Sequence, residues 1–176
     1  SWSTGPPLLM SAARTFGGQC SEAVLHFGSL PNQQLLPAVQ YMHNRNVASG
    51  LSSEFYIMAP LTLEARALSE LEVYIGHEGA TVAGSRRPGS ASGVRSAVDD
   101  VEQRMPNGGV IINLLHGGLL ETFFEEMISK GMAGGIYPVV FTEVESTDLV
   151  HKSVDGGDGH HGLSQYLTQE HYVTGA

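Results

Sequence analysis

The chain has 176 residues, enough for a sizeable core, and we expect a single domain over residues 1–176. Its net charge of −9 argues against a nucleic-acid partner, because only nine lysine and arginine residues could neutralise phosphates. No run of about 18 apolar residues is present, so no membrane span is expected, and a single cysteine excludes an internal disulfide.

The start of the chain is expected to be an irregular extension over about residues 1–20, because Gly-Pro-Pro and Gly-Gly interrupt regular structure. Ser21 is expected to cap a short helix that runs to Phe27. Cys20 is either a nucleophile activated by that helix N-terminus or a buried structural cysteine, and the second interpretation is favoured. The chain begins at Ser1 without a methionine or a signal peptide, so we expect a cytoplasmic protein trimmed from a longer one.

The next segments suggest a mixture of helices and strands. Residues Pro31 to Ala48 are predicted to form a helix, with Pro37 tolerated in its first turns. Phe55 to Met58 is predicted as a short strand. Leu61 to Ile75 has both helical and alternating features, and we interpret it as a helix that passes into a strand. Ala80 to Ala83 is then expected to complete a hairpin across the preceding glycine-containing turn.

Gly84 to Gly93 is predicted to be a loop. It contains the pair Arg86-Arg87, which we interpret as a solvated loop rather than a phosphate site. The loop matches neither phosphate-binding signature and is not a nucleophile elbow. Ser92 is expected to cap a helix from Gly93 to about Arg104.

The stretch from Asn107 to Ser146 has the clearest pattern in the chain. It predicts a buried strand over Val110–Leu115, a glycine junction, a helix with one apolar face, and a second strand over Ile136–Thr142. Gly131 is expected to end the helix. The apolar face consists of Leu119, Leu120, Phe123, Phe124, Met127 and Ile128.

The last segment, about residues 147–176, is rich in glycine, histidine and aspartate. Clustered Asp and His can ligate a metal, but no helical pair of metal-binding histidines is present, so a polar surface loop is favoured. We therefore predict no metal site and no cofactor. The residues concerned are Asp155, Asp158, His160 and His161.

The glycine junction carries the strongest chemical signal. A strand delivers His116 to its carboxyl end, and Gly117 and Gly118 let a ligand approach the unpaired amides of a helix N-terminus. Such amides can stabilise an oxyanion. Glu125 and Ser129 lie on the side of the helix opposite its apolar face, either in solvent or, if a sheet wraps the helix, in a functional site.

The sequence HGGLLETFFE from His116 to Glu125 resembles the signature of hotdog-fold acyl-CoA thioesterases. This resemblance implies an α+β fold, an antiparallel sheet wrapped around a central helix, with a mixed α/β sandwich as the alternative. It implies that the Gly117 amide polarises the thioester carbonyl, that Glu125 activates water or attacks, and that Ser129 helps to hold the nucleophile. It further implies an acyl thioester substrate and a homo-oligomer.

Two alternatives remain open, and whether the protein is an enzyme is left undecided. His116, Tyr137 and Glu170 resemble the His–Tyr–Glu pattern of ADP-ribosyltransferases, which would make the protein dependent on NAD. Few lysines, abundant small polar residues and weak motifs are equally typical of a structural subunit or a fragment of a large assembly such as a viral capsid.

Overall fold

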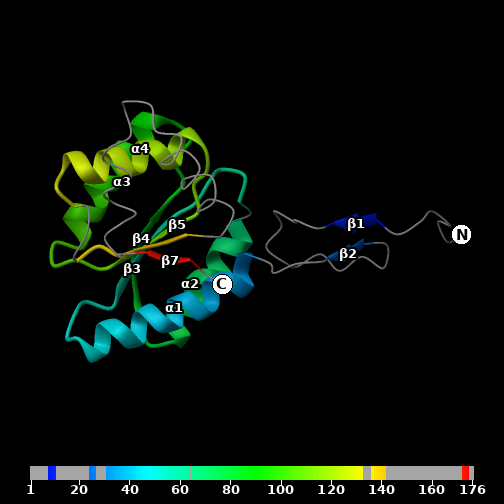
Figure 1. Cartoon of the computed structure of the whole chain (residues 1–176), viewed down its shortest axis with the longest axis horizontal. Helices are drawn as coiled ribbons and strands as arrows, with labels where there is room; N and C mark the ends of the chain where they lie inside the picture. The colour runs from blue at the N-terminus through cyan, green and yellow to red at the C-terminus, as the bar shows by residue number, and fades with distance from the viewer. Residues whose placement is uncertain are drawn as a thin grey trace, which may run out of the picture.

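The computed structural model of the chain describes residues 8–10, 24–26, 31–63, 65–132, 136–141 and 172–174. Two short strands, β1 and β2, pair in parallel as a separate two-stranded sheet. The other elements form an α/β domain (Figure 1). In chain order they are β1 (Leu8–Met10), β2 (Val24–His26), α1 (Pro31–Ala48), β3 (Glu54–Met58), α2 (Ala65–His77), β4 (Thr81–Arg86), α3 (Ala91–Arg104), β5 (Val110–Asn113), α4 (Gly118–Ser129), β6 (Val139–Phe141) and β7 (Tyr172–Thr174).

The main sheet has five strands in the order β4-β3-β5-β6-β7, and every neighbouring pair is parallel. Parallel strands need long crossover connections, and here helices α2, α3 and α4 provide them. The central strands β3 and β5 are short apolar runs, and nearly all of their residues are buried. A strand that is apolar at every position requires cover on both faces.

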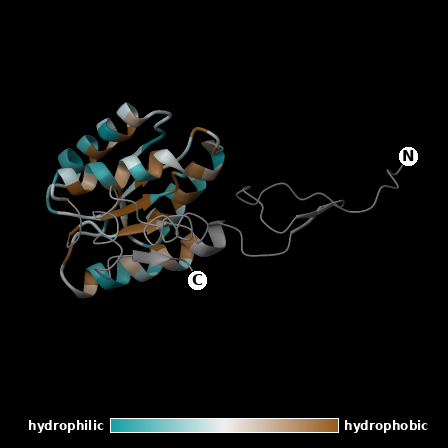
Figure 2. Ribbon diagram, turned by 45° about the horizontal axis from the view of Figure 1, so that its top comes forward, coloured by the Kyte–Doolittle hydropathy of each residue, from teal (hydrophilic) through white to brown (hydrophobic). Residues whose placement is uncertain are grey.

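Helices supply that cover on both faces, so the domain has three layers (Figure 1). Helices α1 and α2 lie on one face, and α3 and α4 lie on the other. The apolar strands run between helices whose outer faces are hydrophilic (Figure 2). Alternate residues of β3 divide between the two cores, because Phe55 and Ile57 pack towards α1 and α2 whereas Tyr56 and Met58 pack towards α3 and α4.

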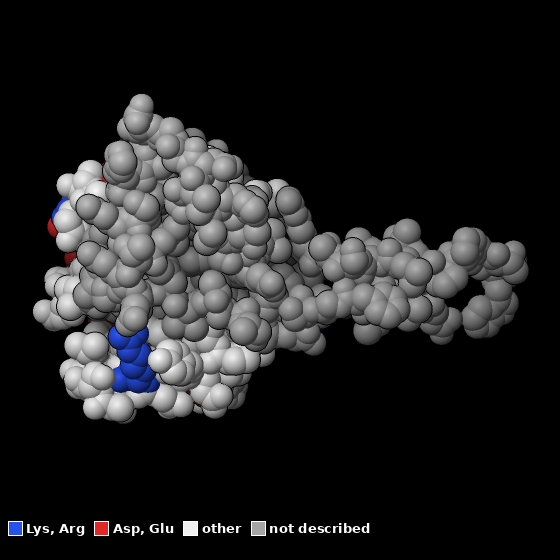
Figure 3. Space-filling view, viewed as in Figure 1, with Lys and Arg blue, Asp and Glu red and all other residues white. Residues whose placement is uncertain are grey.

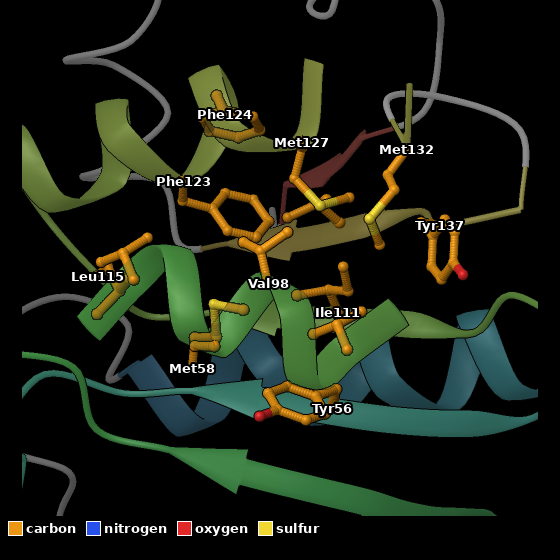
Figure 4. Packing of buried hydrophobic residues seen from close by; sticks show 14 of the residues in the cluster. Tyr56, Met58, Val98, Ile111, Leu115, Phe123, Phe124, Met127, Met132 and Tyr137 are labelled. Carbon is orange, nitrogen blue, oxygen red and sulfur yellow. The ribbon is translucent and has the colours of Figure 1, made fainter. Parts of the chain in front are cut away.

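The core between the sheet and α4 is the more aromatic of the two (Figure 4). Phe123 and Phe124 of α4 meet edge to face, with ring centroids 5.1 Å apart. Val98 contributes from α3 and Ile111 from β5. Burial of these side chains provides the main force that fixes α4 on the sheet.

Most of the local structure predicted between Pro31 and Phe141 is confirmed. Helix α1 has the predicted bounds, and the sequence strand–glycine junction–helix–strand is present as β5, α4 and β6. Gly131 follows α4 with φ of 67°, a conformation that favours glycine and ends the helix. Helix α3 starts slightly earlier than predicted, because Ser90 rather than Ser92 is its N-cap and accepts a hydrogen bond from the Gly93 amide.

Five local predictions are wrong. Strand β1 lies within the segment expected to be irregular, and the end of β4 and the start of α3 lie within the segment predicted as a loop over residues 84–93. Residues 65–77 are helical throughout, because Leu71 and Ile75 are buried neighbours one turn apart on α2 rather than alternating strand residues. The predicted hairpin is absent, because β4 pairs with β3 in parallel after a helical crossover. The segment proposed as a helix from Ser21 to Phe27 contains strand β2.

The predicted antiparallel hotdog sheet is also wrong. Helix α4 is an outer-layer helix on a parallel sheet, not a central helix wrapped by an antiparallel one (Figure 1). Among the described helices, none is both long and apolar enough to cross a membrane.

Candidate functional site

Three strand ends meet at the carboxyl edge of the sheet. The Ala59 amide, just after β3, donates to the Arg86 carbonyl at the end of β4 at 3.0 Å. The Leu114 amide, just after β5, donates to the Met58 carbonyl of β3 at 2.8 Å. These bonds hold the first residues of the three following loops side by side.

The chain leaves β3 and β5 in opposite directions. The loop after β3 leads to α2 on one face of the sheet, and the loop after β5 leads to α4 on the other face. The point where adjacent connections diverge in this way is the topological switch point of an open α/β sheet, and ligands bind outside the strand ends there. We refer to residues 59–63 and 114–117 as the switch-point loops.

Arg87 positions the first switch-point loop. Its guanidinium donates hydrogen bonds to the carbonyls of Leu61 and Leu63, so that a residue after β4 holds the loop after β3. Gly89 is also close to this loop, because a Cβ at Gly89 would lie 2.6 Å from a methyl carbon of Leu61. Leu61 itself is 62% exposed, which is unusual for leucine and places an apolar side chain at the surface of this edge.

The second switch-point loop leads into an open helix N-terminus. Asn113, at the end of β5, is fully buried and accepts a hydrogen bond from the Leu115 amide at 2.9 Å. Gly117 precedes α4 with φ of 59° and ψ of −141°, a conformation essentially restricted to glycine. No side chain of the described residues caps α4, so the amides of its first turn point towards the carboxyl edge.

The exposed residues of this junction match the sequence prediction in position. His116, Gly117 and Gly118 are exposed at the carboxyl edge, and a Cβ at either glycine would meet no atom within 4 Å. A ligand could therefore approach the α4 amides closely. Leu61 and Arg87, which follow the neighbouring strands β3 and β4, lie at the same edge of the sheet and were not expected as site residues.

Glu125 and Ser129 do not belong to this edge. Both are exposed on α4, and the Ser129 hydroxyl donates to the Glu126 carbonyl at 3.0 Å. The buried side of the helix carries its aromatic and aliphatic residues instead. Because no sheet wraps α4, the carboxylate expected to act beside the Gly117 amide lies in solvent.

The most strongly perturbed acid lies on α3 and serves the fold. Asp100 accepts hydrogen bonds from Tyr56 at 2.6 Å, Arg104 at 2.9 Å and Arg86 at 3.2 Å. Burial acts to raise the pKa of Asp100, but these donors outweigh it and lower the pKa to about 2. Gly84 allows the close packing, because a Cβ there would lie 2.9 Å from the Tyr56 ring. The network joins β3, β4 and α3.

The opposite, amino edge of the sheet has a small hollow lined by Asn46, Leu51, Gly109 and Ile136 among others. It has room for about one water molecule and is too small for an organic solute. Among the described atoms on the face shown in Figure 3, lysine and arginine form one clear group and a second small area at the left edge of the view, and no broad charged patch is visible.

The ADP-ribosyltransferase arrangement is not formed by the described residues. Tyr137 is buried and donates a hydrogen bond to the Met105 carbonyl at 2.7 Å. It lies before β6 at the amino edge, whereas His116 follows β5 at the carboxyl edge. In Figure 4, Tyr137 and Leu115, the neighbour of His116, lie at opposite ends of the core.

Several predicted residues lie outside the described part of the chain. They are Cys20, Asp155, Asp158, His160, His161 and Glu170. Within the described part, no group of three or more His, Cys, Asp or Glu side chains is placed to hold a metal ion.

A family model described as a periplasmic binding protein domain matches residues 7–170. Among solved structures, the chain is similar to a solute-binding protein of an ABC transporter from Rhodopseudomonas palustris HaA2 in complex with p-hydroxybenzoic acid. The TM-score is 0.53 at 16% identity, over 69% of this chain and 32% of the other. The C-domain of LpoA from Haemophilus influenzae matches with a TM-score of 0.49 at 14% identity, over 76% of this chain and 39% of the other.

The chain thus spans about a third of the length of the solved structures that it matches. None of the curated proteins compared with it matches. The likeness to the solute-binding protein supports the parallel α/β fold, and the family match covers nearly the whole chain.

These findings contradict the function expected from the sequence. The thioesterase, the ADP-ribosyltransferase and the capsid interpretations are wrong, and so is the acyl thioester as substrate. The cytoplasmic location is contradicted by the match to a periplasmic binding protein domain. The prediction of a homo-oligomer was based on the same thioesterase resemblance, and it stays a prediction. The single domain over residues 1–176 also stays a prediction.

Proposed function

The chain belongs to the periplasmic binding protein domain family, and from that premise we propose that it forms one lobe of an extracytoplasmic solute-binding protein. Proteins of this kind close two domains around a ligand by a hinge motion. One lobe then needs a surface that recognises part of a small molecule and that a second lobe can cover.

The switch-point loops are the surface proposed for that contact. The observation that supports it most is the exposed His116-Gly117-Gly118 junction at the uncapped N-terminus of α4. It offers backbone donors without side chains in front of them, and His116 adds a side chain that can donate or accept. Leu61, exposed on the neighbouring loop, adds an apolar contact.

Binding of small molecules to the 176-residue chain tests this proposal. Backbone amide resonances would be followed by NMR during titration with amino acids, simple amides, sugars and aromatic acids, including p-hydroxybenzoate, up to millimolar concentrations. We expect at least one class to shift residues 59–63 and 115–119 together. Shifts confined to other regions, or none with any class, would contradict a solute site at these loops.

A matched pair of glycine variants separates binding from stability. Gly117→Ala and Gly131→Ala both place an alanine at positive φ, and both Cβ atoms enter open space. Each should cost about 1–3 kcal/mol of stability, because L-residues are strained there, with the larger cost at Gly117, so stability is measured alongside binding. Only Gly117→Ala should also weaken binding of a compound that shifts the switch-point loops. Equal loss of binding in both variants would argue against a role for Gly117.

A further inference from the structure

The charge balance at the carboxyl edge differs from that of the whole chain. The net charge of the chain is −9, yet the described segments 59–63, 86–91 and 113–119 contain no Asp or Glu. They contain two arginines and one histidine, and Arg86 is neutralised by Asp100 of α3. Within these segments, Arg87 is therefore the arginine whose charge is not balanced by a described carboxylate.

Arg87 is unusual among the described cations because it is partly buried and pairs with no described carboxylate. Its charge is held by backbone carbonyls of Leu61 and Leu63, which are acceptors without a formal charge. Arg45 also has no described carboxylate partner, but it is exposed to solvent. The cations that do pair with carboxylates are Arg66, Arg86, Arg95, Arg104 and Lys130.

Two buried side-chain atoms in the described part have no hydrogen-bond partner, and both belong to this edge. They are the Nε of Arg87 and the Nδ2 of Asn113. Both are N–H donors, and a buried donor without an acceptor costs free energy. Asn113 and Arg86 lie opposite Met58 on either side of β3, so the two orphan donors flank the carboxyl end of one strand.

At the surface of this edge, the uncompensated charge of Arg87 and the uncapped N-terminus of α4 are complementary to an anionic acceptor. We propose that the switch-point loops bind the carboxylate group of a small organic acid, with Arg87 as its counter-charge. This inference rests on the proposed solute-binding function and specifies the chemical class of its ligand. Arg87 is partly exposed, and because its Nη2 donates to the Leu61 and Leu63 carbonyls, Nη1 is the group that remains to donate to a carboxylate. The α4 amides next to His116 favour the same charge.

Matched acids and amides test the charge requirement directly. Benzoate, p-hydroxybenzoate and isovalerate would each be compared with the corresponding carboxamide by NMR titration of the 176-residue chain. The amide keeps the size and shape of the acid but removes its charge. We expect each bound carboxylate to bind at least about tenfold more tightly than its amide, the effect of one charge-assisted hydrogen bond.

Variants assign that preference to Arg87. Arg87→Gln should reduce the acid-to-amide ratio of affinities to near one, and Arg87→Lys should retain part of it because the charge remains. Arg66→Gln is the control, since it removes a charge from the first turns of α2 that is 82% exposed and paired with Glu70. A purely structural role for Arg87 would weaken acid and amide equally and leave the ratio unchanged.

The possible outcomes distinguish this inference from the function on which it rests. If acid and amide bind equally at residues 59–63 and 115–119, or if Arg87→Gln keeps the ratio, carboxylate recognition by Arg87 is refuted and the solute site stands. If neither acids nor any other class of solute shifts these residues, both proposals are refuted.

Discussion

On one side of the sheet α3 and α4 are joined by charged side chains, whereas on the other side α1 and α2 are joined mainly by apolar packing. Lys130, at the end of α4, contacts Asp99 at 2.7 Å and Glu102 at 3.0 Å, both on α3. Arg95 of α3 lies 3.6 Å from Glu126 of α4. Among the described residues, no ion pair joins α1 to α2.

Helices α1 and α2 are joined through their apolar faces. Among the described side chains, the polar contact between them is that of the Tyr74 hydroxyl, which donates to the Leu36 carbonyl at a long 3.4 Å. The difference indicates that both layers depend on hydrophobic burial, while the α3/α4 layer adds a contribution that depends on pH and salt.

The largest expected effect tests whether apolar packing dominates on both sides. Phe123→Ala on α4 should lower the free energy of unfolding by about 3–5 kcal/mol, and Ile75→Ala on α2 by about 2–5 kcal/mol, because each leaves a cavity in a fully buried core. Urea denaturation measures both. A loss below about 1 kcal/mol for Phe123→Ala would mean that charged contacts, not the aromatic core, hold α4.

A second pair of variants removes one tyrosine hydroxyl from each side of the sheet. Tyr56→Phe should cost about 1.5–3 kcal/mol, because the Tyr56 hydroxyl donates to the carboxylate of Asp100 at 2.6 Å in a buried network. Tyr74→Phe should cost less than about 0.5 kcal/mol, because its hydrogen bond is long. Urea denaturation at pH 7 gives both values, and equal costs would remove the distinction between the two layers.

Acid should weaken the α3/α4 side specifically. Folding lowers the pKa of Asp100 from its ordinary value of 3.8 to about 2, so its contribution to stability is present above pH 4 and is lost as the pH falls towards 2. We expect a contribution of about 1–2 kcal/mol, reduced by solvent screening of the half-exposed arginines. Asp100→Asn removes it, so the stability difference between wild type and variant should shrink below pH 4. A constant difference from pH 6 to 2 would contradict this.

The smallest effect concerns the Lys130 cluster. Its hydrogen bonds to Asp99 and Glu102 raise the pKa of the ammonium, which therefore stays charged at neutral pH. Lys130→Met should lower the melting temperature slightly at low salt and not at about 1 M salt, where screening is nearly complete. Arg66→Met, which removes an exposed pair within α2, should have no effect. Loss of stability that persists at high salt would assign a packing role to Lys130.

The structure shows how much of the fold the sequence could predict. The helices from Pro31 and Gly118 and the strand from Val110 were recognisable because their periodicity, glycines and prolines act over a few residues. Continuous apolar strands with helices between them are typical of a parallel sheet covered on both faces, but the prediction did not use this pattern and kept a mixed α/β sandwich only as the alternative. The fold class was predicted from the thioesterase resemblance of ten residues, and it is wrong.

The candidate site was predicted only in part. The His116-Gly117-Gly118 junction was identified, because a histidine and two glycines between a strand and a helix form a local pattern. Arg87 was interpreted as a solvated loop residue, because nothing near it in sequence shows that its guanidinium reaches the Leu61 carbonyl 26 residues away. Hydrogen bonds of that separation depend on strand order.

The sequence by itself determined helix α1, the succession of β5, α4 and β6, the glycine turn before α4 and the apolar face of that helix, since each depends on neighbours within about two turns. The tertiary structure decided the order of the strands, the exposure of Glu125 and the meeting of Arg87, Leu61 and the α4 N-terminus at one edge. These features depend on which distant strands pair. The same local pattern is compatible with a helix wrapped by an antiparallel sheet and with a helix that covers one face of a parallel sheet. For the glycine junction, the strand order placed it at a topological switch point.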